Sequence, residues 1–214
     1  MSQRPRKTRE QQDGRPVIVV FGGSAPMAGD PVYEEARYLG QALARAGFAV
    51  ASGGYIGVME AVSRGASEAG GHVIGVTCQA IEAWRPEVTP NRWVAEEVRF
   101  ATLQERMRYM LALGDGIVAC RGSIGTLSEV AMAWAMLQVG EIPPKPLVLL
   151  GEGWSAFLEA FRAASYVRPE DLALLHLSPT VEETVTFLVK ALGAERPDTR
   201  SSPDPALNVK DSTV

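Results

Sequence analysis

Nine consecutive residues, 121 to 129, read RGSIGTLSE and combine glycines, hydroxyls and a carboxylate. They follow the apolar run Gly116–Cys120, which is typical of a strand, and open the helix-like segment Val130–Leu137. A strand that turns directly into a helix presents several free backbone N–H groups and the positive end of the helix dipole at one point. Such a point binds anions, and a phosphate is the ligand that we expect there.

The side chains of this stretch favour the same ligand. Its glycines let the backbone approach a ligand closely, and its hydroxyls add hydrogen-bond donors. The predicted substrate-binding residues of the stretch are Gly122, Ser123, Ile124, Gly125 and Thr126. The same sequence also fits an N-terminal capping box, in which Thr126 caps the helix and Glu129 reaches back to it. The two interpretations do not exclude each other.

The composition limits the class of protein. The chain has 214 residues, a formal net charge of −4 and a pI near 5.3. A general nucleic-acid or anionic-membrane binder would carry a basic balance. No apolar run approaches the roughly 20 residues of a membrane helix, and the first ten residues lack the apolar core of a secretory signal. We therefore expect a cytoplasmic protein with no nucleic-acid partner and no membrane partner.

Metal or redox chemistry has little support in the sequence. Cys78 and Cys120 cannot form a metal cluster by themselves, and we interpret both as small buried apolar residues. His72 and His176 stand alone in apolar surroundings, where packing or surface roles are commoner than catalysis. We expect neither a metal nor a cofactor.

The sequence predicts one folded domain, residues 15–192, between two polar arms. Residues 1–14 lack periodic apolar positions, and residues 193–214 hold three prolines among serine, aspartate and threonine. Both compositions are typical of disordered segments. Between them, short β-branched runs alternate with amphipathic segments, which indicates βαβ units. The predicted fold is α/β and Rossmann-like, with three α/β/α layers around an open, mostly parallel sheet.

The apolar pattern predicts seven strands and six helices. The strands are Val17–Phe21, Phe48–Ala51, His72–Thr77, Glu97–Phe100, Gly116–Cys120, Leu147–Leu150 and Leu174–Leu177. The first helix runs from Pro31 to a stop at Gly47, and the others are Val58–Ala69, Leu103–Leu113, Val130–Leu137, Trp154–Ala163 and Val181–Leu192. The segment Cys78–Trp93 shows no clear period and is predicted to be a loop that could cover a site.

Three glycine-rich turns each follow a strand and precede a helix: Gly22–Ser24, Ser52–Gly57 and Arg121–Gly125. Right-handed crossovers place the carboxyl ends of all parallel strands at one edge of the sheet, so the three turns are expected to meet there. The first two turns add five predicted substrate-binding residues, which are Gly23, Ser24, Gly53, Gly54 and Gly57. None of the turns reads G-x-G-x-x-G or carries a Walker A lysine, which disfavours dinucleotide oxidoreduction and NTP hydrolysis.

Three segments of the chain read FGGSAPMAGDPVYEEARYLGQALARAGFAVASGGYIGVMEAVSRGASEAGGHVIGV, LQERM and GDGIVACRGSIGTLSEV. Together they resemble the Lonely Guy (LOG) family, once labelled lysine decarboxylases, over about Val17 to Leu150. The resemblance is strongest to a bacterial branch that is also similar to molybdenum-cofactor carrier proteins. It implies a dimeric, Rossmann-like phosphoribohydrolase, which cuts the N-glycosidic bond of a nucleoside 5′-monophosphate such as AMP or a cytokinin riboside monophosphate. The products are the free base and ribose 5-phosphate.

The family's motif, P-G-G-x-G-T-x-x-E with an arginine on the preceding helix, implies two catalytic residues here. Its glutamate falls on Glu129 and its arginine on Arg106. Glycosidic cleavage builds positive charge on the ribose, and a nearby carboxylate can stabilise that charge or activate the attacking water. Arg106 could hold the phosphate or the ribose, although the sequence alone would place it on a solvated helix face.

The chain departs from that motif at three positions. Arg121 replaces the family's proline, Ser123 replaces a glycine, and Met107 replaces the lysine that commonly follows the arginine. These departures leave two other hypotheses open. In one, the protein is a non-catalytic carrier of a nucleotide or of the molybdenum cofactor. In the other, it is an interaction protein that keeps the fold without the ligand.

The segment Val130–Leu137 is apolar on several sides of its helical axis. A helix of this kind must be covered on more than one side, by the sheet and by either neighbouring helices or a second subunit. We predict a homodimer that packs through this helix.

Overall fold

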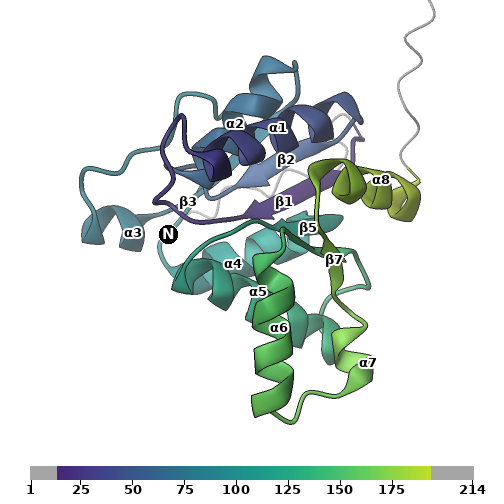
Figure 1. The fold of residues 1–214 in the computed structure, drawn as a ribbon. Helices are drawn as coiled ribbons and strands as arrows, with labels where there is room; N and C mark the ends of the chain where they lie inside the picture. The colour runs from purple at the N-terminus through teal and green to yellow at the C-terminus, as the bar shows by residue number, and fades with distance from the viewer. Residues whose placement is uncertain (1–13, 194–214) are drawn as a thin grey trace, which may run out of the picture.

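A computed structural model describes residues 14–193 (Figure 1). The predicted arms lie outside the described residues except for Gly14 and Gly193. The strands are β1 (Val17–Phe21), β2 (Ala49–Ser52), β3 (Val73–Cys78), β4 (Glu96–Phe100), β5 (Gly116–Ala119), β6 (Leu147–Leu150) and β7 (His176–Ser178). The helices are α1 (Pro31–Arg45), α2 (Val58–Glu68), α3 (Gln79–Trp84), α4 (Leu103–Leu113), α5 (Ile124–Gln138), α6 (Gly153–Ala164), α7 (Pro169–Leu172) and α8 (Val181–Leu192).

The strands form one sheet in the order β4-β3-β2-β1-β5-β6-β7, and every neighbouring pair is parallel. Most of these strands are continuous apolar runs because helices cover both faces of the sheet. One face packs against α1, α2 and α8, and the other against α4, α5 and α6 (Figure 1). The predicted three-layer α/β fold is confirmed.

Strand β1 is central, and the chain order reverses beside it. Strands β2, β3 and β4 lie on one side of β1, while β5, β6 and β7 lie on the other. In open α/β sheets, ligands bind outside the carboxyl ends of the strands at such a reversal. The turns after β1, β2 and β5 therefore lie at the position where this architecture places a ligand.

Two short helices were missing from the prediction. The segment expected to be a loop, Cys78–Trp93, begins with helix α3, which is six residues long and contains no buried residue. Helix α7 has four residues, of which only Asp171 is buried. A helix without a buried stripe leaves no apolar period in the sequence, so neither could be recognised.

The predicted capping box is wrong, because α5 begins earlier than the sequence suggested. Ser123 has extended backbone angles and is the residue that precedes the helix, which starts at Ile124. Thr126 is therefore the third residue of the helix rather than its cap. A capping residue needs a non-helical backbone, which Thr126 does not have. The backbone N–H groups of Ile124, Gly125 and Thr126 therefore all lie in the first turn of α5.

Cys78 and Cys120 are both buried and free, as predicted. The imidazole of His72 lies 3.2 Å from the carboxylate of Glu96, and the ring of His176 stacks on Phe187, so both histidines have the packing or surface roles expected. Within residues 14–193, no helix is both long enough and apolar enough to span a membrane.

Candidate active site

Arg106 lies on α4 with its charged group turned into the protein. A capping box formed by Thr102 and Glu105 fixes the start of this helix. Arg106 is only 6% exposed, and its Nε donates a 2.7 Å hydrogen bond to the carbonyl oxygen of Val76 in the C-terminal half of β3. The solvated position considered from the sequence alone is therefore wrong. The guanidinium is held at the carboxyl edge of the sheet.

Glu129 approaches the same point from α5. Its Oε1 lies 3.6 Å from Nη1 of Arg106, and its side chain is 14% exposed. The structure thus brings together the two residues that the LOG resemblance singled out. The Glu129 side chain is thus mostly but not wholly covered.

The environment of Glu129 disfavours its ionised form. Burial raises the pKa of Glu129 from 4.5 to about 7, and the positive charge of Arg106 partly opposes this effect. When the carboxylate ionises, the free energy of unfolding falls by at most about 3 kcal/mol. Carboxyl groups with a pKa near neutrality are frequent among catalytic acids and bases.

We predict a pH-dependent stability difference between the wild type and Glu129→Gln. Because folding raises the pKa of Glu129, the protonated carboxyl group stabilises the folded protein. This stability is fully present below pH 4.5 and is lost as the pH rises through about 7. The glutamine of the variant does not ionise, so from pH 5 to pH 8 the wild type should lose about 1–3 kcal/mol of unfolding free energy relative to the variant. Urea unfolding at both pH values measures this, and a difference that does not change with pH would contradict it.

The three glycine turns meet beside this pair. The N–H of Gly23, after β1, donates a 3.2 Å hydrogen bond to the carbonyl of Arg121, after β5. The carbonyl of Gly23 accepts a 2.9 Å hydrogen bond from the N–H of Val58, which opens α2. Gly57 has a φ of +73°, and a side chain there would overlap the backbone of Gly23 and Ser24. The starts of α2 and α5 thus both lie against the turn after β1, as predicted.

The turn after β2 lies directly against the arginine. A Cβ atom at Gly53 would overlap Nη2 of Arg106 and the sulfur of Met59. The next residue, Gly54, packs on Gly75 in β3 and on Thr77. Gly53 therefore belongs to the immediate surroundings of the Arg106–Glu129 pair, whereas Gly54 fits the turn onto the sheet.

The start of α5 is open to solvent. Gly122, Ser123, Ile124 and Gly125 are exposed, and Ile124 has 79% of its surface accessible. Thr126 is different, because it is buried with Gly122 packed against its side chain. The first turn of α5 contains no acidic residue. Its N–H groups and helix dipole therefore present an uncompensated positive end, which suits an anion.

The SLOG cluster4 family matches residues 15–160, which is more than half of the chain. The chain belongs to this family.

Proteins similar to this SLOG cluster4 protein include two groups. A cytokinin riboside 5′-monophosphate phosphoribohydrolase of Arabidopsis thaliana is 31% identical, with 84% of this chain and 78% of that protein covered. A phosphoribohydrolase of the same name from Rhodococcoides fascians is 30% identical, with 63% and 67% covered. Among solved structures, the molybdenum cofactor binding protein of Rippkaea orientalis has a TM-score of 0.65 and 25% identity, with 83% and 98% covered. The predicted resemblance to both groups is confirmed.

The three departures from the LOG motif have distinct surroundings in this SLOG cluster4 protein. The Arg121 side chain is exposed and makes no ion pair or hydrogen bond within residues 14–193. The Ser123 side chain makes no capping hydrogen bond to α5. Met107 is partly buried and packs on the core beneath α4. Two of the departures therefore lie at the open rim, and the third lies in the packing of the helix that carries Arg106.

Sequence reasoning missed the group that orients Arg106. The carbonyl of Val76 is a backbone acceptor, and a backbone acceptor leaves no mark on residue type. It also missed Ser52 and Ser63, whose hydroxyls lie behind the turn after β2. A serine at the end of an apolar strand was the only sequence signal for this pair.

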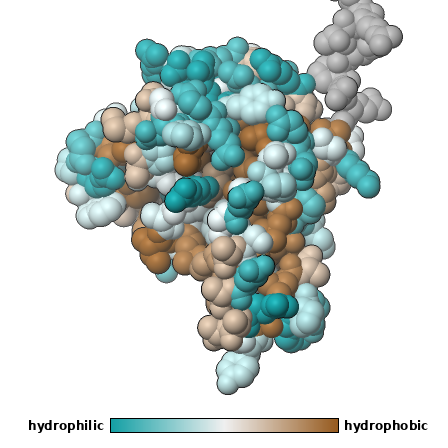
Figure 2. Space-filling view, viewed as in Figure 1, coloured by the Kyte–Doolittle hydropathy of each residue, from teal (hydrophilic) through white to brown (hydrophobic). Residues whose placement is uncertain are grey.

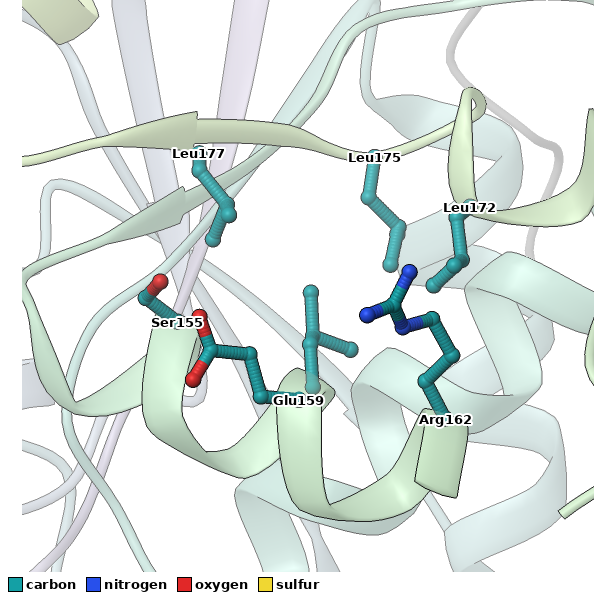
Figure 3. Close-up of a pocket in the computed structure, with 7 residues that line it drawn as sticks. Ser155, Glu159, Arg162, Leu172, Leu175 and Leu177 are labelled. Carbon is teal, nitrogen blue, oxygen red and sulfur yellow. The ribbon is translucent and has the colours of Figure 1, made fainter. Parts of the chain in front are cut away.

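A separate hollow lies at the β7 end of the sheet (Figure 3). It has a volume of about 330 Å³ and is lined by Ser155, Leu158, Glu159, Arg162, Leu172, Leu175 and Leu177. The side chains of Glu159 and Arg162 point from α6 toward the space below Leu177 and Leu175 (Figure 3). None of the predicted site residues lines this hollow, so it is not part of the candidate site of this SLOG cluster4 protein.

Proposed function

We propose that this protein hydrolyses the N-glycosidic bond of a nucleoside 5′-monophosphate, of the AMP or cytokinin riboside 5′-monophosphate type, to the free base and ribose 5-phosphate. The observation that carries the proposal is the 3.6 Å pair of Arg106 and Glu129 beside the open start of α5. An open helix start that suits a phosphate and a carboxylate with a pKa of about 7 lie on the same helix, about one and a half turns apart. These are the two groups that the reaction needs.

In the proposed complex, the phosphate lies against the N–H groups at the start of α5. The exposed side chains of Arg121 and Ser123 are available to contact its oxygens. This placement directs the ribose inward, toward Glu129. Fixing the phosphate at one end orients the sugar for reaction at the other, which lowers the entropic part of the barrier.

Glu129 acts on the anomeric carbon of the ribose. As the bond to the base breaks, positive charge develops on the sugar, and the ionised carboxylate stabilises it. The same carboxylate can accept a proton from the attacking water, because its pKa of about 7 suits proton transfer near neutral pH. Arg106 holds the carboxylate in place and favours its ionised form.

Incubation of the purified protein with AMP tests the proposal. Chromatography should detect adenine and ribose 5-phosphate in equal amounts, and adenosine, which lacks the phosphate, should be hydrolysed far more slowly. Absence of adenine after prolonged incubation of the folded protein with millimolar AMP would contradict the proposed reaction.

The carrier function is a second candidate. Its support is the likeness to the molybdenum cofactor binding protein of Rippkaea orientalis, together with the departures at Arg121 and Ser123. The same rim would then hold the phosphate of a pterin without bond cleavage. Calorimetric binding of a phosphorylated ligand without any turnover of it would favour this function over hydrolysis.

We also propose that the protein forms a homodimer through the helix segment 130–137 of α5. Met132 is 49% exposed although it lies in the middle of an apolar helix. Neighbouring α6 adds Phe157 and Phe161, whose stacked rings are 6.1 Å apart and more than a third exposed. In Figure 2, hydrophobic side chains are interspersed with hydrophilic ones over the region where Figure 1 places α4, α5 and α6. A second copy of the chain would cover this surface.

We predict that Met132→Glu yields a monomer. A charge placed in the centre of an apolar interface would have to be desolvated without a partner, which costs several kcal/mol. Sedimentation velocity should show the wild type as a dimer and the variant as a monomer. The control Ala191→Glu adds the same charge to an exposed position of α8, on the opposite face of the sheet, and should remain dimeric. A wild type that sediments as a monomer would refute the interface.

A further inference from the structure

Two serine hydroxyls with no exposed surface lie behind the turn that follows β2. Ser52 is the last residue of β2, and Ser63 lies in the second turn of α2. The N–H of Gly54 donates to Oγ of Ser52 at 3.1 Å, and that oxygen lies 3.3 Å from Oγ of Ser63. Ser63 in turn donates a 2.7 Å hydrogen bond to the carbonyl of Met59. This chain of hydrogen bonds ties the glycine turn to α2.

The turn after β2 lies in direct contact with Arg106. Gly53 leaves no room for a Cβ atom between its own backbone and the guanidinium. On its other sides, the guanidinium is held by the carbonyl of Val76 at 2.7 Å and faces Glu129 at 3.6 Å. It is thus confined by the turn, a strand and a carboxylate. Any shift of the turn changes the space that the arginine occupies.

Stability alone is a weak reason for these hydroxyls. A buried hydrogen bond replaces one to water, so its net contribution to folding is only about 1 kcal/mol. Residues Ala51 and Val62, adjacent to the two serines in the chain, are fully buried and apolar. Unlike apolar side chains, the serine hydroxyls form directional hydrogen bonds, and these fix the angle at which the turn leaves β2.

We infer that Ser52 and Ser63 are positioning residues, which set the place of the Arg106 guanidinium relative to Glu129 by holding the turn at Gly53. The inference rests on the proposed hydrolase function of the same site. The serines do not touch the substrate. They act on the reaction through Arg106.

Ser52→Ala tests the inference. The variant should lower kcat for AMP roughly 10- to 100-fold with little change in KM, because small displacements of catalytic groups have effects of this size. It should also raise the pKa of Glu129, measured by carbon NMR titration of the carboxyl group, by about half a unit or more, because Arg106 moves away. The double variant Ser52→Ala/Ser63→Ala should be no worse than Ser52→Ala, since both changes break one chain.

The matched control is Ser67→Ala, one turn further along α2. The Ser67 side chain makes no hydrogen bond within residues 14–193, so both kcat and the pKa of Glu129 should stay at wild-type values. Ser52→Ala that lowers the melting temperature but leaves kcat and the pKa of Glu129 unchanged would overturn the inference. If the wild type itself lacks turnover, the proposed function fails, and the NMR titration still decides whether the serines position Arg106.

Discussion

Replacement of Glu129 by glutamine is expected to reduce kcat for AMP hydrolysis about 100- to 10,000-fold, the range typical of removing a catalytic acid–base group. Glutamine keeps the size of the side chain but cannot ionise, so it neither stabilises the developing charge on the ribose nor accepts a proton from water. Binding should change little, because the phosphate contacts the start of α5 rather than this side chain. Steady-state kinetics measured by adenine release give both parameters.

A second glutamate supplies the control for this prediction. Glu159 lies on α6, is exposed, and lines the hollow at the β7 end of the sheet. Glu159→Gln removes the same charge from a position that is not part of the candidate site, and should retain wild-type kcat. Turnover by Glu129→Gln within about threefold of the wild type would exclude a role in the chemical step, since acid–base groups contribute far more than this.

Replacement of Arg106 by glutamine is expected to reduce kcat/KM about 100- to 1,000-fold, in line with the loss of a preorganised charge at a reaction centre. The loss has two causes. The carbonyl of Val76 and the carboxylate of Glu129 both lose their partner, so the carboxylate is no longer held in place. In addition, the pKa of Glu129 should rise further above 7, because the guanidinium is the charge that lowers it.

The variant Arg108→Gln is the matched control for Arg106. Arg108 lies on the same helix two residues further on, but it is exposed. Its replacement should leave kcat/KM and the melting temperature near wild-type values. Because Arg106→Gln leaves buried polar groups unpaired, Arg106→Lys is measured beside it, which keeps the charge but not the planar fork of donors. Full activity of a folded Arg106→Gln protein would show that the pair is not needed for the reaction.

Much of the fold could be predicted from the apolar pattern. The five inner strands were recognised because each is wholly buried, and the six longer helices because each buries residues of one face, which imposes a pattern on the sequence. The edge strands β4 and β7 are only partly buried, and β7 begins two residues later than predicted. Helix α3 escaped recognition because it buries nothing. The start of α5 was placed too late because its glycine suggested a loop, whereas the extended backbone of Ser123 lets the helix begin directly after it.

The candidate site was only partly predictable. The resemblance to the LOG family pointed to Glu129 and Arg106, and the convergence of parallel strands placed the glycine turns at one edge. The contact between the two side chains depends on how α4 and α5 pack on the sheet, which no local pattern encodes. The orientation of Arg106 depends on a backbone carbonyl and on a turn held by buried hydroxyls, and these appear only in three dimensions.

A crystal structure of Glu129→Gln with bound AMP would show directly how the nucleotide binds, because the variant should bind it without consuming it. The phosphate oxygens should lie within hydrogen-bonding distance of N–H groups between Gly122 and Thr126. The anomeric carbon of the ribose should face residue 129. A phosphate bound away from the start of α5, or a ribose turned away from residue 129, would contradict the proposed complex.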